Sequence, residues 1–378
     1  MNFIEKIRGA FFVLLISLVP VFLFDFFWGQ KILNYPELKF EEALREQQRL
    51  EKSWRVKHDF FHHGLRSDFR GRMNWLHPFR QYEVCTDSNG FKSSCSSGKL
   101  DRKKFNFVFI GDSFTEGVGL PYEETFVGMI ASARPDVSVA NMGVASYSPS
   151  IYRSKIKYYL DKGYEFDHVV VFIDISDIQD EVVISTLKDG RVSENKTELV
   201  SVNNTKSQPT EPNELKQHLR RLFPLSYNGL HKIKNLVTGN RGSEVFYHPN
   251  PRAAWTYDLS SVGYGENGAQ YALDKSVSEM NELYKMLSKK GIALSVGVYP
   301  WPDQLLFDSQ DSLQTRVWEE FCRNKCKSFY NLFPVFWEGV SNHGAVNTIK
   351  EYYFVGDVHF NERGNRLLAD EVLKSLLH

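Results

Sequence analysis

The chain has 378 residues, of which 42% are hydrophobic and 24% are charged. This balance is typical of a folded protein, and the length suits one large α/β domain with accessory segments, or two small domains. Lys plus Arg and Asp plus Glu both number 46, so the formal net charge is zero and nothing indicates a nucleic-acid-binding surface.

An apolar segment lies close to the N-terminus. Residues 10–24 read AFFVLLISLVPVFLF, and three aromatic residues follow Asp25. With basic residues before it, the segment approaches the roughly 20 residues that cross a bilayer. A cleaved signal peptide is the alternative, but no cleavage site of the A-x-A type follows. We expect a cytoplasmic tip at residues 1–8, an uncleaved transmembrane anchor at residues 9–29, and a single-pass protein whose remainder is periplasmic or extracellular.

Residues 30–104 are interpreted as a stalk and accessory segment. Within them, residues 40–54 have good helix formers and neither Gly nor Pro, which predicts a helix. The stretch that follows is loop-rich, and a Ser-Asn-Gly turn signal lies at residues 88–90.

The chain has four cysteines, which allow three pairings. Two local disulfides, Cys85–Cys95 and Cys322–Cys326, are the simplest arrangement in an oxidising compartment. A zinc site is the alternative, but neither pair has C-x-x-C spacing, so no metal site is expected.

Strands and helices alternate from Phe105 onward. Short apolar runs predict strands, and longer amphipathic segments predict helices. The strands are expected at 105–110, 137–140, 168–173, 293–299 and 327–331, and the helices at 122–133, 150–162, 272–290, 312–325 and 364–377. This alternation predicts a parallel sheet with helices on both faces and ligands beyond the C-terminal ends of its strands.

One stretch of the α/β region, residues 186–265, lacks this alternation. It is rich in Asn, Ser, Thr, Lys, Gly and Pro. We interpret it as an insertion between the third and fourth core strands that serves as a lid or a partner-docking loop, or as a solvated excursion without a direct role.

The first chemical motif is GDSFTEG at residues 111–117, directly after the first core strand. A Ser at a strand-to-helix turn has an exposed hydroxyl, and the N–H groups of the following helix are free to hold an oxyanion. Because a free Ser hydroxyl is a weak nucleophile, Ser113 needs a general base.

The second motif lies near the C-terminus, where Asp357 and His359 stand two residues apart. Histidine has the near-neutral pKa of a general base, and a carboxylate can orient its ring and stabilise the protonated form. Together the two motifs predict a Ser113–His359–Asp357 triad.

The three blocks GDSFTEG, NMGVASYSP (141–149) and DVHFNERG (357–364) resemble those of the SGNH, or GDSL-type, hydrolase superfamily. The resemblance covers Phe105 to the C-terminus. It implies a flavodoxin-like three-layer sandwich over residues 105–378 and an oxyanion hole to which Ser113 and Gly143 contribute N–H groups.

Two features depart from the family pattern. Ser176-Asp177 stands where Asn-Asp is expected, so the hydroxyl of Ser176 would replace the amide donor of the oxyanion hole, and low hydrolytic activity would follow. The Asp-x-His spacing replaces the commoner Asp-x-x-His. It resembles the branch linked to cell-surface polysaccharide O-acetylation, including alginate modification.

Further side chains are candidates for a pocket. Asp112 is expected to support the turn, Asp177 follows the third strand, and Trp301 either stacks on a sugar or acyl chain or packs within its loop. Three histidines precede the core and either line the cleft or have structural roles: His58, His62 and His63.

These observations predict a membrane-anchored serine esterase or O-acyl (acetyl) transferase that acts on esters of extracytoplasmic glycans or lipids without a cofactor. The alternative is an SGNH-fold glycan-binding or assembly subunit with weak catalysis. The sequence identifies no protein partner.

Overall fold

The structure is a computed structural model that describes residues 12, 17–75, 80–96, 101–183, 185–188, 191–194, 222–223, 225–226, 250–260 and 263–376. It divides into two units, residues 1–46 with 203–246 and residues 47–202 with 247–378. The second unit contains the sheet and the candidate site.

The first unit is largely helical where it is described. Residues 17–24 are helical, and a π-helix, η1 (Asp25–Gly29), leads into α2 (Gln30–Trp54). The carboxylate of Asp25 accepts the N–H groups of Leu225 at 2.9 Å and Ser226 at 2.6 Å. No helix in the described part of the chain combines the length and the apolar character needed to cross a bilayer. The predicted tip at 1–8 and residues 9–11 and 13–16 of the predicted anchor at 9–29 lie outside the described residues.

The second unit is built on an eight-stranded sheet with the order β12-β11-β8-β6-β7-β5-β4-β3. Its parallel strands are β6 (Lys104–Ile110), β7 (Val139–Asn141), β8 (Glu165–Ile173), β11 (Ala293–Val298) and β12 (Phe329–Asn331). They lie at the positions that the sequence predicts. Their order, with the first strand between the second and third, is that of flavodoxin-like folds.

The sheet continues beyond β7 in antiparallel fashion, an extension of the predicted parallel sheet that the sequence analysis did not include. The added strands are β3 (Arg70–Trp75), β4 (Arg80–Thr86) and β5 (Lys92–Ser93). In β4, Tyr82 and Val84 are buried whereas Glu83 is exposed. This alternation is typical of a strand with one buried face. Part of the segment 30–104, interpreted from sequence as accessory, therefore belongs to the central sheet.

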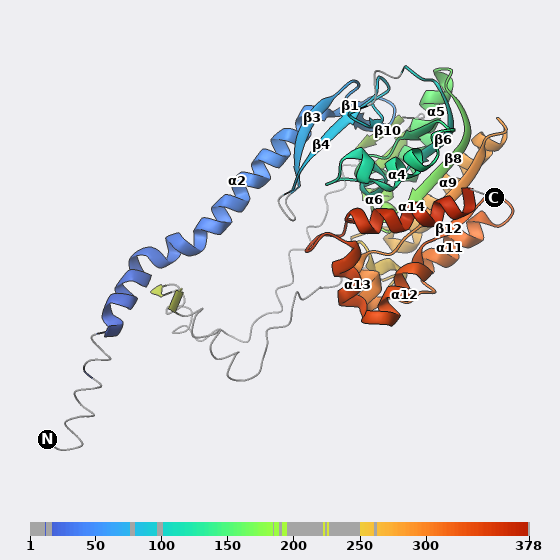
Figure 1. Ribbon diagram of the computed structural model, residues 1–378. Coiled ribbons are helices and arrows are strands. Elements are labelled where there is room, and N and C mark those ends of the chain that lie inside the picture. The colour runs from blue at the N-terminus through green and yellow to red at the C-terminus, as the bar shows by residue number, and fades with distance from the viewer. Residues whose placement is uncertain are drawn as a thin grey trace. The chain divides into compact units, whose positions relative to one another are not determined.

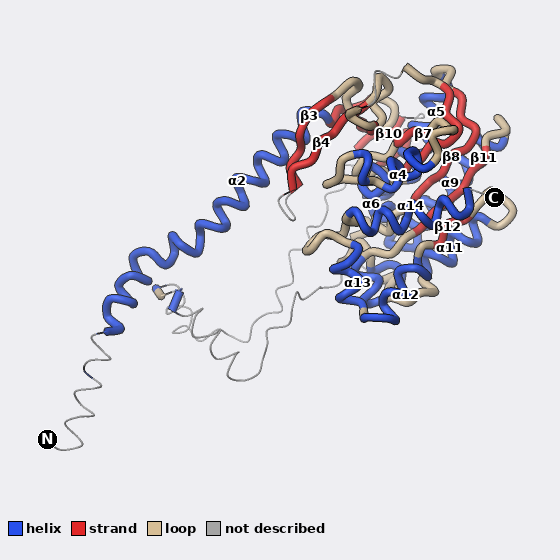
Figure 2. Tube along the Cα trace, in the orientation of Figure 1, coloured by secondary structure: helices blue, strands red, loops and turns tan. Residues whose placement is uncertain are grey.

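Helices cover both faces of the sheet and complete the three layers (Figures 1 and 2). One face carries α5 (Pro149–Asp161), α6 (Asp177–Val183), α9 (Gly268–Ser288) and α11 (Leu313–Cys322). The other carries α4 (Phe126–Ala133), α12 (Phe333–His343), α13 (Ala345–Tyr352) and α14 (Glu362–Leu376). Of two short helices, η2 (Tyr122–Glu124) lies beside α4, and α10 (Pro302–Phe307) lies beside α13.

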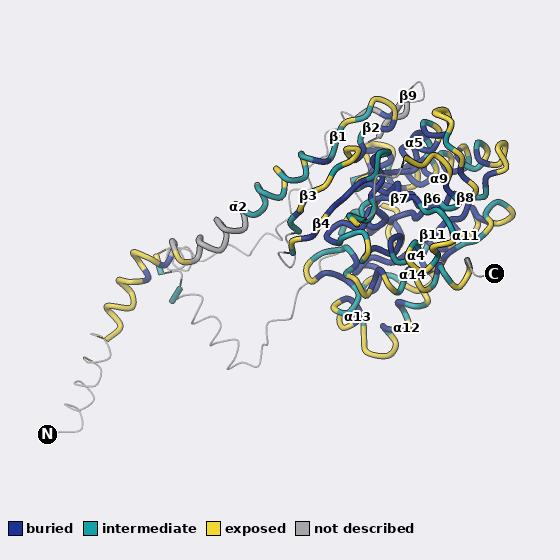
Figure 3. The backbone as a smooth tube through the Cα atoms, turned by 45° about the horizontal axis from the view of Figure 1, so that its top comes forward, coloured by how far each residue is buried: buried dark blue, intermediate teal, exposed yellow. Residues whose placement is uncertain are grey.

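The central strands form the core between these layers. Every residue from Val169 to Ile173 in β8 is fully buried, as are Val108, Phe109 and Ile110 in β6. Figure 3 shows these strands as the buried interior of the second unit. A strand covered on both faces needs a continuous apolar run, which is why these strands are evident in the sequence.

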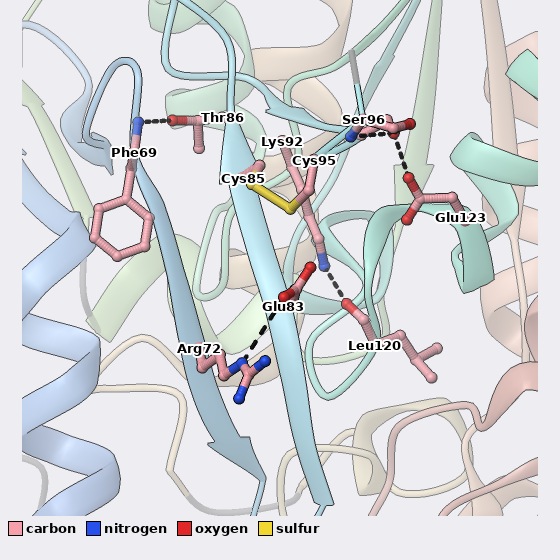
Figure 4. Close-up of a disulfide and its surroundings, with 11 residues drawn as sticks. Phe69, Arg72, Glu83, Cys85, Thr86, Lys92, Cys95, Ser96, Leu120 and Glu123 are labelled. Atoms are coloured by element: carbon pink, nitrogen blue, oxygen red, sulfur yellow. Dashed lines mark hydrogen bonds and ion pairs between the residues drawn. A yellow bond between two sulfur atoms is a disulfide. The ribbon is translucent and has the colours of Figure 1, made fainter. Parts of the chain in front are cut away.

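Both predicted disulfides are confirmed, Cys85–Cys95 and Cys322–Cys326. The first joins β4 to the segment after β5 and lies close to Lys92 (Figure 4). The side chain of Lys92 is buried, and its ammonium group donates to the carbonyls of Gly117 at 2.8 Å and Leu120 at 2.7 Å. The added strands are thereby linked to the loop that follows the Ser113 motif.

The two ends of the predicted insertion pack on the second unit. Strands β9 (Ser185–Lys188) and β10 (Arg191–Glu194) pair in antiparallel fashion, and Val192 bridges to Phe61. At the other end, Trp255 is fully buried and donates its indole N–H to the Ile175 carbonyl at 2.9 Å. Most of the intervening insertion lies outside the described residues, so a lid or docking role stays a prediction.

Candidate active site

The turn that carries Ser113 follows β6 at once. Helix α3 (Ser113–Glu116) begins at the serine, and Asp112 caps it by accepting the Phe114 N–H at 2.9 Å. A Cβ atom on Gly111 would lie 2.2 Å from Thr115 Oγ1 and 2.7 Å from the Phe172 carbonyl oxygen. Only glycine therefore allows β6 and α3 to approach so closely.

Three predicted residues meet at this end of the sheet. Ser113 Oγ lies 2.8 Å from His359 Nε2, and His359 Nδ1 lies 2.8 Å from Asp357 Oδ1. The serine is 246 residues away from the histidine in sequence. The geometry is that of a nucleophile, a general base and an orienting acid in hydrogen-bonding order.

A closed loop between α13 and α14 holds the acid and the base. Tyr353 and Phe360 form an antiparallel bridge, and the Phe354 N–H donates to the His359 carbonyl at 2.9 Å. Asn361 donates its side-chain amide to the Glu351 carbonyl at 2.8 Å. The loop therefore fixes the histidine backbone independently of Ser113.

The electrostatics favour a basic imidazole. Burial disfavours the imidazolium form of His359, but the hydrogen bond and charge of Asp357 outweigh that effect, so the pKa of His359 is raised. Burial also disfavours the carboxylate of Asp357, yet its hydrogen bonds from His359 and Trp75 leave its pKa lowered. The pair is thus arranged to accept a proton on the ring while the acid stays ionised.

Trp75 is a site residue that the sequence analysis missed. Its indole N–H donates to Asp357 Oδ2 at 2.7 Å, and its ring meets that of His359 edge-on at 5.3 Å between centroids. It comes from β3, 282 residues before Asp357, and no motif surrounds it. The alternation of buried side chains in β4 is the one signal that places this hairpin on the sheet.

Trp75→Phe is expected to lower kcat/KM by about tenfold to a hundredfold, because a charge-assisted hydrogen bond contributes about 1.5–3 kcal/mol. The acid limb of the pH–rate profile should also move to higher pH, since Asp357 with one donor fewer stabilises the imidazolium more strongly. Steady-state kinetics across pH measures both effects.

Trp318→Phe is the matched control for this variant. Trp318 is fully buried whereas Trp75 is partly buried, and the Trp318 indole N–H has no hydrogen-bond partner among the described residues. An unchanged pH profile in Trp75→Phe would show that Trp75 merely fills space.

The two other predicted oxyanion donors already have partners. The Gly143 N–H donates to Asn141 Oδ1 at 3.0 Å, and a Cβ atom on Gly143 would lie 2.6–2.7 Å from the backbone of Glu116 and Thr115. The Ser176 N–H donates to Asp174 Oδ1 at 2.8 Å, and its hydroxyl also bonds Asp174. Their part in an oxyanion hole stays a prediction, whereas the Ser113 N–H lies at a helix start and has no acceptor within the helix.

Three buried carboxylates lie beneath the nucleophile. Oxygens of Asp112, Asp174 and Asp177 lie within 4.8 Å of one another, and Asp112 Oδ2 lies 3.2 Å from Ser113 Oγ. Burial and the charge of Asp174 raise the pKa of Asp112 to about 8. The pKa values of Asp174 and Asp177 are also raised, chiefly by burial. At neutral pH the cluster therefore holds protons rather than three full charges.

Neighbouring donors hold this cluster in place. Tyr152 donates to Asp177 at 2.6 Å, and Tyr299 lies 3.3 Å from Asp112. Trp301 donates its indole N–H to Asp174 at 2.5 Å and is only 3% exposed, so it packs against the cluster rather than facing solvent. Asp180, the next carboxylate of α6, is paired with Arg252 at 2.7 Å.

A bell-shaped pH profile is expected from these groups. Catalysis needs neutral His359, so kcat/KM falls as pH drops through its raised pKa. It also falls as pH rises past about 8, because ionised Asp112 places a negative charge beside the developing oxyanion.

Asp112→Asn should remove the alkaline limb of this profile, since the amide is neutral and still caps α3. Asp112→Ala instead loses the cap, which costs about 1 kcal/mol of stability. A persisting alkaline limb in Asp112→Asn would exclude Asp112 as its origin. Rates measured from acid to alkaline pH, together with thermal unfolding, distinguish the variants.

No family model matches the chain, and no curated protein does. Solved structures that it is similar to include a lipolytic protein of the G-D-S-L family from Veillonella parvula, with 13% identity, 72% of this chain and 98% of that chain covered, and a TM-score of 0.37. An acetylxylan esterase, Axe2, from Geobacillus stearothermophilus has 12% identity, 72% and 94% coverage, and a TM-score of 0.39.

Another similar structure is the esterase EstA from Pseudoalteromonas sp., with 12% identity, 72% and 97% coverage, and a TM-score of 0.36. At such identities and TM-scores the likeness carries no argument about function.

Proposed function

We propose that the chain is a serine ester hydrolase with Ser113 as nucleophile, His359 as general base and Asp357 as orienting acid. The observation that carries this proposal is the continuous hydrogen-bonded series from Ser113 Oγ through the imidazole to Asp357, each link 2.8 Å long. A general base must lie within about 2.6–3.2 Å of the heavy atom whose proton it removes, which the link from Ser113 to His359 satisfies.

The reaction follows from these positions. Ser113 Oγ attacks the ester carbonyl while His359 Nε2 takes its proton, and Asp357 stabilises the imidazolium that forms. The tetrahedral oxyanion meets the Ser113 N–H at the start of α3. Its collapse returns the proton to the leaving alkoxide and leaves an acyl-Ser113 ester. Water, activated by the same imidazole, then releases the acid.

The substrate class that we propose is an acetyl or similar ester on an extracytoplasmic glycan or lipid. The apolar N-terminal run supports attachment to a membrane, and the two disulfides support an oxidising compartment. Transfer of the acyl group to a sugar hydroxyl uses the same residues and differs in whether water is excluded from the second half-reaction.

A second candidate is a glycan-binding or assembly subunit with weak catalysis. It is favoured by the existing partners of the Gly143 N–H and the Ser176 hydroxyl, which leave fewer donors ready for an oxyanion. Loss of one such donor commonly costs about 10²–10³-fold in rate.

The test is to supply the full-length protein with an aryl acetate, with and without an oligosaccharide acceptor, and to label it with a serine-directed phosphonate. We expect acetate release and a phosphonate adduct on Ser113, located by mass spectrometry. Acetylated oligosaccharide as the main product would assign transfer rather than hydrolysis. Glycan binding without adduct formation or turnover would favour the second candidate and overturn the first.

A further inference from the structure

A cavity of about 570 Å³ lies in the second unit, away from the catalytic residues. Its walls include the hairpin of β1 (Arg55–His58) and β2 (His62–Leu65), the turn before β5, and the C-terminal end of α5. Lys103 and Tyr164 line it just before β6 and β8 begin, whereas Ser113 follows the end of β6. A strand of the length of β6 spans about 20 Å. The cavity therefore lies at the N-terminal ends of the parallel strands, and the nucleophile lies at their C-terminal ends.

The charged side chains of the cavity are all basic. Arg66, Lys103, Lys155 and Lys162 line it, and none of its described lining residues is Asp or Glu. The nearby carboxylate of Asp87 accepts the N–H groups of Asn89 and Phe91, both at 2.9 Å, and so belongs to the turn. The cavity therefore favours an anion.

Lys155 strengthens this preference because it is only 2% exposed. Its ammonium group donates to the Met142 carbonyl at 3.0 Å and contacts the Tyr147 hydroxyl at 3.1 Å, but no carboxylate of the described residues pairs with it. Burial lowers the pKa of Lys155 to about 7. The charges of Glu116 and Asp87 favour this ammonium group from beyond ion-pair distance. An anion in the cavity would stabilise it further.

Aromatic rings supply the rest of the lining. Phe61, Tyr158, Tyr159 and Tyr164 face the cavity, and His58 stacks on Phe61 at 3.5 Å between centroids. Lys103 lies 5.8 Å from the Tyr164 ring and Lys162 lies 5.7 Å from the Tyr158 ring. The C–H face of a pyranose packs on such rings, while an acidic substituent pairs with the lysines. An acyl chain would need an apolar lining without these charges.

We propose that this cavity binds an anionic sugar unit, bearing a carboxylate or phosphate, of the glycan that the enzyme de-esterifies. The inference rests on the proposed function and extends it: the chain would hold its substrate at a second point, at the end of the parallel strands opposite Ser113. Such a site favours a charged polysaccharide over a small neutral ester by raising the local substrate concentration.

The test is calorimetric titration of the full-length protein with tetragalacturonate, its neutral methyl ester, and glucose 6-phosphate. We expect the wild-type protein to bind tetragalacturonate or the sugar phosphate, which distinguishes carboxylate from phosphate, and to bind the methyl ester more weakly. The double variant Lys103→Gln, Lys162→Gln should weaken anion binding by about tenfold, since it removes two exposed charge partners. Tyr158→Ala should weaken it as well.

The control is the double variant Lys157→Gln, Lys290→Gln. Both lysines are exposed and neither lines the cavity. It should bind like the wild-type protein, and all variants should hydrolyse an aryl acetate at the wild-type rate. Absent binding, equal affinity for acid and methyl ester, or unchanged affinity in both cavity variants would overturn the site. Binding without any esterase activity would instead overturn the proposed function alone.

Discussion

Ser113→Ala is expected to reduce kcat/KM for an aryl acetate by about 10⁴-fold or more, because it removes the atom that forms the acyl-enzyme. His359→Gln should cause a similar loss, since Ser113 Oγ would then lack the base that lies 2.8 Å away. The double variant should be no worse than either single one, because residues that act as a unit are not additive. Burst-phase and steady-state kinetics measure these effects.

The control for this series is Ser309→Ala, which removes an exposed serine hydroxyl outside the two catalytic motifs. It should have wild-type kinetics and an unchanged unfolding temperature. If Ser113→Ala kept the rate of the wild-type protein, Ser113 would be rejected as the nucleophile. Equal losses in the Ser309 control would point to a preparation effect instead.

The parallel core of the fold is evident in the sequence because of how it is buried. Strands β6 and β8 are covered on both faces, which requires the continuous apolar runs at 105–110 and 168–173. The antiparallel edge was not predicted because β3, RGRMNW, has one exposed face and few apolar residues. Its position depends on pairing with β4, which no local pattern specifies.

The residues of the candidate site also fall into those that the sequence predicted and those that it did not. Ser113, Asp357 and His359 were identified because each lies in a short motif at a strand end or before a helix. Trp75 and Asp174 were not, because their roles appear only where distant segments meet. Asp174 directly follows β8, as Asp112 closely follows β6, so its position at a strand end was a usable signal.

Two kinds of buried charge flank the nucleophile. Toward α6, the carboxylates of Asp112, Asp174 and Asp177 repel one another and retain protons. Toward the added strands, Glu116 at the end of α3 is fully buried and ionised. The difference is the partner: Arg55 binds Glu116 through two hydrogen bonds, both 2.8 Å long. Burial opposes the ionised form of Glu116, but Arg55 and Lys92 outweigh it and lower its pKa.

This pair leads to the largest expected effect on stability. Glu116→Ala should lower the free energy of unfolding by about 3–5 kcal/mol, because it leaves the Arg55 side chain, which is only 18% exposed, without its main counter-charge. It also removes the acceptor of the Ala145 N–H, which lies 2.8 Å from Glu116 Oε2. Since the folded-state pKa of Glu116 is lowered, its contribution is present above the unfolded-state pKa and is lost as pH falls. Chemical denaturation at neutral and acid pH measures both effects.

An ion pair at the surface with a similar distance between its charged atoms shows whether burial causes the loss of stability. Lys157 and Asp161 lie 2.5 Å apart, but their side chains are 53% and 58% exposed, so Lys157→Ala should cost less than about 1 kcal/mol. The double variant Arg55→Met, Glu116→Leu should be more stable than Glu116→Ala, because it leaves no unpaired buried charge. If the double variant were less stable than Glu116→Ala, the loss would come from packing around α3 rather than from charge. Burial, more than the distance between the charged atoms, sets the cost of breaking an ion pair in this fold.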